Sequence, residues 1–70
     1  MSARVRNRIR EWRAATPMTQ VELADACGVT RQTVIALEAE KYSPSLELAF
    51  KLANALGRTL DEVFQYVEEK

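Results

Sequence analysis

The sequence predicts an all-α fold, a compact bundle of five short helices that forms one domain over residues 1–70. Three observations indicate this class. Apolar residues recur at intervals of three and four along most of the chain, which is the period of one helix face. The two Gly and two Pro separate these periodic segments. No segment shows the apolar–polar alternation that marks a half-buried strand.

The first helix is expected over about residues 4–15. Val5, Ile9 and Trp12 stand four and three positions apart, so their side chains share one face of a helix. Pro17 ends the segment, because the residue before a proline is disfavoured in helical geometry. Trp12 is interpreted as a core residue. The alternative, an aromatic platform on which nucleic-acid bases stack, would carry further aromatic side chains beside it.

The second helix is expected to follow Thr19. The segment TQVE is a capping box, in which the Thr19 hydroxyl and the Glu22 carboxylate each accept a backbone N–H at the helix start. Gly28 ends this helix, because glycine adopts the left-handed conformation of a helix C-terminus without steric cost. The residues expected on its inner face are Leu23, Ala24 and Cys27.

The third helix is expected over about residues 31–41, with Thr30 as its N-terminal cap. Steps of about 100° per residue place Val34, Leu37 and the stem of Lys41 together on its inner side. The side that faces away from this core is unusual, because a solvated helix face normally carries Lys and Glu. Here it is small and apolar, edged by an arginine: Arg31, Gln32, Ile35, Ala36 and Ala39.

Only residues 28–30 separate the second helix from the third. A connection this short, with a glycine that accepts positive φ, holds two helices in a fixed and steeply crossed pair. This is the geometry of a helix-turn-helix over about residues 19–41. In that motif the first helix lies over a phosphate backbone and the second enters the major groove of DNA.

The fourth helix, expected over about residues 45–56, is apolar around most of its circumference and is therefore predicted to be central. Gly57 ends it. The segment TLDE, from Thr59 to Glu62, is a second capping box and opens a fifth helix over about residues 60–67. Its inward stripe is expected to be Leu60, Val63, Phe64 and Val67.

The composition excludes several functional classes. Cys27 is the only cysteine and histidine is absent, so the sequence lacks both the ligands of a Cys/His zinc site and the base of a Ser–His–Asp or Cys–His hydrolase. No Gly-rich phosphate loop is present. We therefore expect no enzyme, no cofactor, no metal and no small-molecule ligand. No apolar run reaches the ~18–20 residues of a membrane span, so no membrane partner and a cytoplasmic location are expected.

The charge is unevenly spread although its sum is zero. Residues 1–13 hold five arginines against Glu11 alone, whereas the rest of the chain is net acidic. Such asymmetry favours an approach of the N-terminal part to a polyanion. The alternative is that these arginines only make an exposed helix face soluble in water.

The segment MTQVELADACGVTRQTVIALEAEKYSPSLELAFKLANALG closely resembles the DNA-binding domain of Cro and the phage repressors, the xenobiotic-response-element type of helix-turn-helix regulator. The likeness covers about residues 4–67 and is closest to short, single-domain bacterial and archaeal members. It implies a lambda-repressor-like fold and double-stranded DNA as the partner.

The resemblance implies that Arg31, Gln32 and Ala36 read bases. The chemistry agrees, because Gln32 can pair with two atoms of adenine and Arg31 with guanine or a phosphate, while Ile35 can pack on a thymine methyl group. The small Ala36 lets base edges come close but cannot donate a hydrogen bond. The expected base-reading residues are Arg31, Gln32, Ile35 and Ala36.

Phosphate contacts are expected from the rim of the motif. The resemblance places Gln20 where the family binds a phosphate, and the N-terminus of the second helix adds free N–H groups. The family often has Asn-Gly where this chain has Ala39 and Glu40, and the Glu40 charge is unfavourable beside a phosphate. The expected phosphate contacts are Arg10, Thr19, Gln20, Thr30, Thr33, Lys41 and Tyr42.

Two further pairings are expected. The resemblance implies a partly buried ion pair between Arg13 and Glu38 that links the first helix to the third; the alternative is two ordinary surface charges. A homodimer is expected through the end of the chain, over residues 59–70. Its contact residues would be Phe64, Tyr66 and Val67, whose alternative role is ordinary core.

The sequence thus predicts a DNA-binding transcriptional regulator, a homodimeric repressor that reads a palindromic operator through the major groove with its third helix. Two rival functions stay open. One is the antitoxin of a toxin–antitoxin pair, which would also bind a protein. The other is a protein-binding helical module without DNA activity.

Overall fold

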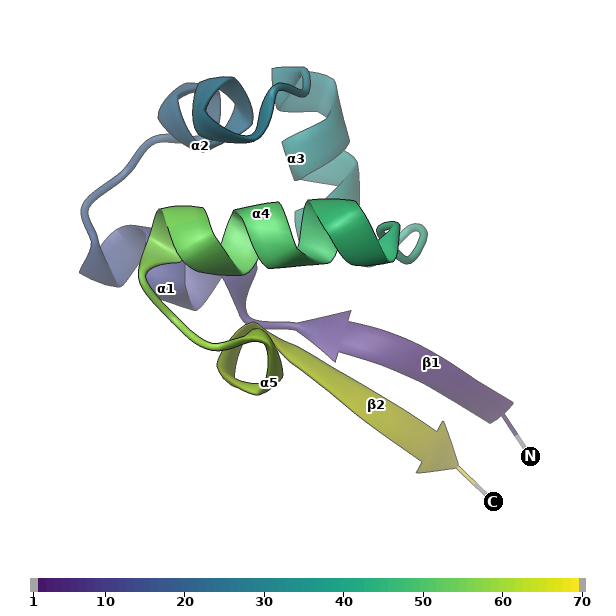
Figure 1. Cartoon of the computed structure of the whole chain (residues 1–70). Coiled ribbons are helices and arrows are strands. Elements are labelled where there is room, and N and C mark those ends of the chain that lie inside the picture. The colour runs from purple at the N-terminus through teal and green to yellow at the C-terminus, as the bar shows by residue number, and fades with distance from the viewer. Residues whose placement is uncertain (1, 70) are drawn as a thin grey trace.

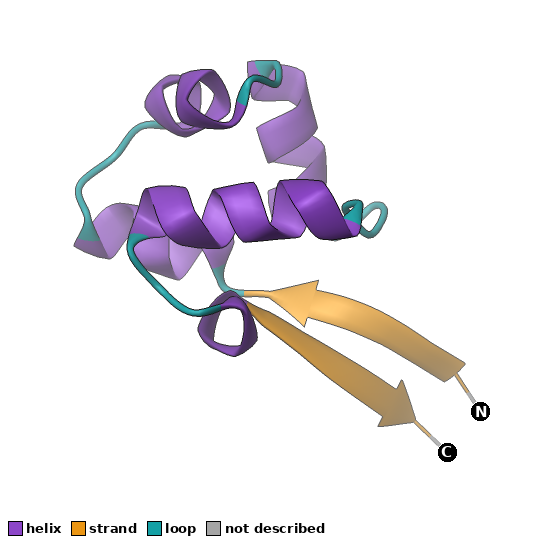
Figure 2. Cartoon of the chain, in the orientation of Figure 1, coloured by secondary structure: helices purple, strands orange, loops and turns teal. Residues whose placement is uncertain are grey.

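The computed structural model describes residues 2–69, which form five helices and a two-stranded antiparallel sheet (Figure 1). The helices pack into one globule, while the two strands form a ribbon that projects from it (Figure 2). The predicted helical bundle is confirmed, but the fold is not purely α. The elements are β1 Ser2–Asn7, α1 Ile9–Ala15, α2 Gln20–Cys27, α3 Arg31–Glu38, α4 Leu46–Leu56, α5 Leu60–Val63 and β2 Phe64–Glu69.

The ribbon corrects the expectation for both ends of the chain. The helix expected over residues 4–15 begins only at Ile9, and the helix expected over residues 60–67 ends at Val63. Phe64 takes an extended backbone, with φ −121° and ψ 137°. From there β2 runs antiparallel to β1, with Val5 opposite Tyr66.

The reason is that the two ends of the chain pair with each other. Val5 lies four positions before Ile9, as on a helix face, but Val5 and Tyr66 also share one face of the ribbon. The strand preference of a segment depends on the neighbour that it finds across the sheet, and that neighbour is here at the opposite end of the sequence. Local periodicity does not report such a pairing.

The predicted caps of α2 and α4 are confirmed. The Thr19 side chain accepts the Glu22 N–H at 3.0 Å, and the Glu22 carboxylate accepts the Thr19 N–H at 2.8 Å. These bonds lower the pKa of Glu22 below its ordinary value of 4.5. Gly28 and Gly57 end the two helices with φ of 70° and 68°, conformations that glycine adopts at little cost.

Helix α3 ends at Glu38, so the helix expected to reach residue 41 is three residues shorter. Glu40 follows with a left-handed φ of 58°. Its N–H donates to the Leu37 carbonyl at 2.9 Å, and the N–H of Lys41 donates to the Ala36 carbonyl at 3.1 Å. This is the hydrogen-bond pattern of a Schellman motif, in which glycine usually occupies the Glu40 position. The expectation that the stem of Lys41 packs inward is wrong, because this side chain lies beyond the helix and is exposed.

Glu40 keeps this strained conformation while its carboxylate binds the first strand. Its Oε2 accepts the backbone N–H of Asn7 at 3.1 Å, and its Oε1 lies 3.6 Å from Nε of Arg6. The Asn7 side chain adds a bond from Nδ2 to the Leu37 carbonyl at 2.7 Å. The inner end of β1 is thereby tied to the C-terminus of α3.

We expect Glu40→Gly to be more stable than Glu40→Ala by about 1 kcal/mol, because only glycine removes the cost of a left-handed backbone. Both variants lose the contacts to Arg6 and Asn7, so their difference isolates the backbone term. Urea unfolding of the two variants measures it. Equal midpoints would show that φ at this position carries no strain.

The core lies between α4 and the other helices. Leu52 of α4 is fully buried, and α2 packs against both α3 and α4. Cys27 is part of this core, where burial raises the pKa of its thiol. Trp12 packs at the edge of the core and donates from Nε1 to the Glu62 carbonyl at 2.9 Å. The buried core residues are Ile9, Leu23, Ala24, Cys27, Val34, Leu37, Ala49, Leu52, Ala53, Leu56 and Val63.

Candidate nucleic-acid interface

Helices α2 and α3 are joined by a turn of three residues that the sequence determines closely. After Gly28, the Val29 N–H donates to the Ala24 carbonyl at 3.0 Å, which closes the end of α2. Thr30 has an extended backbone and its side chain accepts the Thr33 N–H at 3.2 Å, which starts α3. The two helices cross because Ala24 leaves room for α3, and both inner faces are buried.

This crossing leaves the opposite side of α3 at the surface. Arg31 and Gln32, in its first turn, are exposed. Ile35 and Ala36, one turn further on, are half-buried at the helix flank. The four expected base-reading residues therefore lie on one helix, with the polar ones at its N-terminal end, and Ala39 continues the exposed edge.

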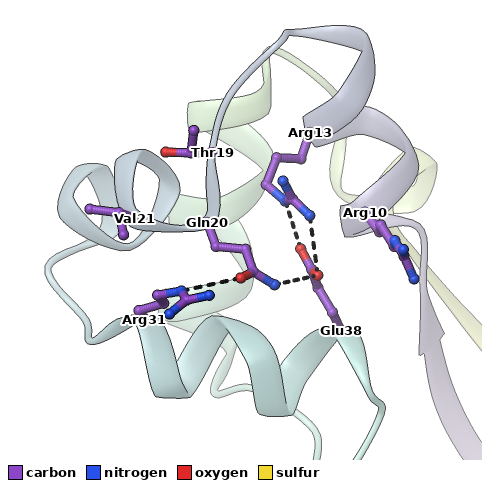
Figure 3. A pocket seen from close by; sticks show the side chains of 7 residues that line it. All are labelled: Arg10, Arg13, Thr19, Gln20, Val21, Arg31 and Glu38. Carbon is purple, nitrogen blue, oxygen red and sulfur yellow. Dashed lines mark hydrogen bonds and ion pairs between the residues drawn. The ribbon is translucent and has the colours of Figure 1, made fainter.

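A chain of hydrogen bonds runs behind this surface and connects three helices (Figure 3). Nε of Arg13 on α1 donates to Oε2 of Glu38 on α3 at 2.8 Å, and Nη2 approaches Oε1 at 3.4 Å. Nε2 of Gln20 on α2 donates to Oε1 of Glu38 at 3.1 Å. Oε1 of the same Gln20 then accepts from Nε of Arg31 at 3.3 Å.

The chain of bonds fixes the direction of the Gln20 amide. Because Glu38 is an acceptor, the Gln20 nitrogen must face it and the Gln20 oxygen must face Arg31. The Arg13 and Glu38 side chains are 18% and 9% exposed, so this ion pair is shielded from water more than any other in the described residues. Gln20 is thus engaged within the protein, as well as standing at the expected phosphate position.

Arg10 and Arg31 beside these bonds, and Lys41 after the C-terminus of α3, have no carboxylate partner among the described side chains. Among the side chains of residues 4–68, no acidic oxygen lies within 4.0 Å of the charged nitrogens of Arg10, Arg31 or Lys41, whereas Arg6, for example, is paired. Arg10 and Arg31 line an open depression between α1, α2 and α3 (Figure 3). The other residues that line it are Arg13, Thr19, Gln20, Val21 and Glu38.

The remaining expected phosphate residues surround α3. Thr30 and Thr33 form its first turn and their hydroxyls lie 3.1 Å apart. Lys41 and Tyr42 follow its C-terminus, and both are exposed. These four residues therefore lie at the start of α3 and directly after its end.

The residues expected to form a dimer contact lie on β2 and not on a fifth helix. Tyr66 is 70% exposed, whereas Phe64 and Val67 are half-buried. Val67 points to the face of the ribbon opposite to that of Phe64 and Tyr66, because successive strand residues alternate.

Sequence reasoning missed the residues that hold the ribbon to the helices. Asn7 and Glu40 carry this link, together with Arg6. The alanine–glutamate pair in place of the family's Asn-Gly was the available signal. It marked an unusual turn after α3, but a carboxylate partner on the first strand could not be read from it.

Two crossed helices, α2 and α3, are joined by a turn of three residues, and one side of α3 is exposed. This arrangement defines a helix-turn-helix protein. The helix-turn-helix family model HTH_3 matches residues 9–63. The chain belongs to this family of DNA-binding transcriptional regulators.

Individual relatives agree with this assignment. A protein of Methanothermobacter thermautotrophicus described as an "uncharacterized HTH-type transcriptional regulator" is 54% identical over 61 residues, covering 86% of this chain and 88% of that protein. One of Archaeoglobus fulgidus with the same description is 46% identical over 66 residues, covering 94% and 93%. The solved structure of the clp gene regulator ClgR from Corynebacterium glutamicum has a TM-score of 0.74 and 31% identity, over 77% of this chain and 57% of that one. No helix in the described residues is long and apolar enough to span a membrane.

Proposed function

We propose that this protein is a sequence-specific, homodimeric repressor that occupies a palindromic operator in double-stranded DNA and acts in the cytoplasm. Helix α3 enters the major groove and reads base edges. The observation that carries this proposal is the exposed side of α3, where Arg31 and Gln32 are exposed and are followed by small or apolar side chains.

The hydrogen-bond chain behind α3 supports base reading by Arg31. A long arginine side chain loses conformational freedom when it binds a base, and part of that cost is removed if the free protein already holds it. The Gln20 oxygen binds Arg31 Nε at 3.3 Å, which restrains the guanidinium at the start of α3. Gln32 beside it can pair with adenine through its amide.

The unpaired cations support the phosphate contacts. Arg10 lines the depression between the helices, and the N-terminus of α2 borders the same depression at Thr19 and Gln20. Backbone N–H groups at a helix start favour an anion. A phosphate beside α1 and α2 would therefore position the protein, while α3 specifies the sequence.

A dimer supports tight binding by so small a domain. Two copies related by a two-fold axis place two copies of α3 one turn of DNA apart, ~34 Å, on a palindromic site. The family relationship favours this role over an antitoxin or a protein-binding module, since the relatives described above are transcriptional regulators.

Two variants separate base reading from phosphate binding. Gln32→Ala should lower discrimination at one base position by ~1–3 kcal/mol and leave non-specific affinity nearly unchanged. Arg10→Ala should weaken binding to every sequence and reduce the slope of log K against log salt by ~1. Sites selected from a random duplex pool provide the probes, and their half-site spacing reports whether two copies bind.

An equal loss on all sequences for Gln32→Ala would remove its base-reading role. A selection that returns no preferred site, with no duplex binding at low ionic strength, would overturn the proposed function as a whole.

A further inference from the structure

The ribbon of β1 and β2 lies outside residues 9–63, the part that the family model matches. It projects from the helices with few elements beside it (Figure 1). A two-stranded ribbon alone is at most marginally stable in water, so such a ribbon gains stability when a further strand pairs with it. The question is which of its two edges is open.

The hydrogen-bond pattern of the ribbon shows which backbone groups point outward. The Arg8 N–H donates to the Val63 carbonyl at 2.8 Å, which continues the register of Asn7 opposite Phe64. Because hydrogen-bonded and non-hydrogen-bonded pairs alternate along an antiparallel ladder, the N–H and C=O groups of every second residue face away from the partner strand. The residues with outward groups are Ala3, Val5 and Asn7 on β1 and Phe64, Tyr66 and Glu68 on β2.

The edge of β1 is partly closed. The outward N–H of Asn7 is taken by the Glu40 carboxylate. Arg4 and Arg6 follow along this strand, and two such edges brought together would place their positive charges side by side. Charged residues on an edge strand hinder pairing with another chain.

The edge of β2 is uncharged in its middle and is open beyond Phe64. Its middle, Gln65, Tyr66 and Val67, carries no charge, and Tyr66 is 70% exposed. Apart from β1, the element that β2 mainly touches is α5, from which it continues. The Phe64 N–H is used by the end of α5, but the outward groups of Tyr66 have no partner within residues 2–69. A row of unpaired groups like this is a template for another strand.

We infer that β2 pairs antiparallel with β2 of a second copy across a two-fold axis at Tyr66, so that two ribbons form one four-stranded sheet. The inference rests on the homodimer of the proposed function and specifies how it is built. This register places Tyr66 opposite Tyr66 of the other copy and Phe64 opposite its Glu68. All three residues with outward groups on β2 then have a strand residue opposite them, Phe64 through its carbonyl alone, and no two glutamates stand opposite each other.

Other arrangements use the strands less well. An axis at Gln65 or Val67 leaves one of the three outward residues without a strand residue opposite it within the span of β2. Pairing of β1 with β2 of the next copy is head-to-tail and gives rings or open filaments, not a two-fold dimer. Pairing at Tyr66 is closed, and the two Tyr66 rings lie on the same face, where each covers part of the other.

Disulfide trapping tests the register. In Tyr66→Cys the two sulfurs face each other across the axis, with Cα atoms ~5.5 Å apart, within the range that a disulfide spans. Glu68→Cys is the matched control, because its two copies lie four residues apart along the strand, or about 13 Å. Mild oxidation should give covalent dimers at least about tenfold faster for Tyr66→Cys than for Glu68→Cys. The wild type, whose one thiol is buried, should give none.

One proline variant and one alanine variant of Tyr66 test the backbone pairing without a new thiol. Proline is tolerated on an edge strand where its nitrogen faces outward, so Tyr66→Pro should keep the fold but become monomeric. Tyr66→Ala keeps the outward N–H and should weaken dimerisation less. Circular dichroism and light scattering after gel filtration measure fold and mass.

The outcomes separate this inference from the proposed function. A wild type that stays monomeric at high concentration yet binds its selected duplex, or similar trapping rates at Tyr66 and Glu68, would overturn the pairing and leave DNA reading intact. Trapping at Tyr66 by a protein without any duplex affinity would support the pairing and overturn the proposed function.

Discussion

Glu38→Ala is expected to lower the free energy of unfolding by about 3 kcal/mol. The substitution removes the acceptor of three donor nitrogens, Nε and Nη2 of Arg13 at 2.8 and 3.4 Å and Nε2 of Gln20 at 3.1 Å. Breaking a buried ion pair by removing one partner typically costs ~3–5 kcal/mol. The lower end applies here, because Arg13 is 18% exposed and keeps a bond to the Met18 carbonyl.

A loss of this size is large for a domain of this length. Proteins are stable by only about 5–15 kcal/mol, and 1 kcal/mol corresponds to about 4–8 °C in Tm for a small domain. The Tm should therefore fall by more than about 10 °C. Thermal unfolding followed by circular dichroism at neutral pH measures it.

Glu47→Ala is the matched control. Glu47 also pairs with a cation, Lys51 at 3.2 Å, but its side chain is 80% exposed. Exposed pairs contribute ~0–1 kcal/mol, so this variant should unfold within a few degrees of the wild type. If the two variants melted alike, the link between α1 and α3 would carry no special stability.

Ala36→Glu is expected to weaken duplex binding at least about 100-fold. In the proposed complex Ala36 lies where base edges approach α3, and a glutamate there would be both too long and of the same sign as the phosphates. Like charges brought together at an interface cost several kcal/mol, and each 1.4 kcal/mol is about tenfold in affinity. Glutamate is a good helix former, so α3 itself should persist.

Ala15→Glu makes the same change of charge and size at an exposed position outside the proposed DNA-binding surface. Ala15 is exposed at the end of α1, about 200° around that helix from Arg13. Its duplex affinity should stay within a few fold of the wild type, measured by fluorescence anisotropy at fixed salt. Equal losses for both variants would mean that net charge alone governs binding, and that α3 does not face DNA.

The helix-turn-helix could be predicted closely because its signals are local. The capping box at Thr19 and Glu22, the left-handed Gly28 and the cap at Thr30 each act within a few residues. The inner and outer sides of α3 follow from helical periodicity, apart from Lys41. Lys41 does not join the core, because the turn at Glu40 ends the helix before it.

The ribbon could not be predicted in the same way. Val5 fits a helix face and a strand face equally well, and only its neighbour Tyr66 from the other end of the chain decides between them. The roles of Gln20 and Asn7 also depend on groups from other helices. A side-chain amide offers both a donor and an acceptor, so the sequence does not say which partner it will find.

The amino-acid sequence by itself thus determined where α2, α3, α4 and α5 begin, where α1, α2 and α4 end, the turn between α2 and α3 and the residues at the surface of α3. These depend on backbone preferences and on hydrogen bonds within one turn, which neighbouring residues supply. Only the tertiary structure decided that both ends of the chain leave the helical bundle as strands and that Glu40 holds β1 to α3. It also decided that Gln20 forms hydrogen bonds to both Glu38 and Arg31. Each of these is a contact between segments far apart in the chain, and its free energy exists only once the helices have packed.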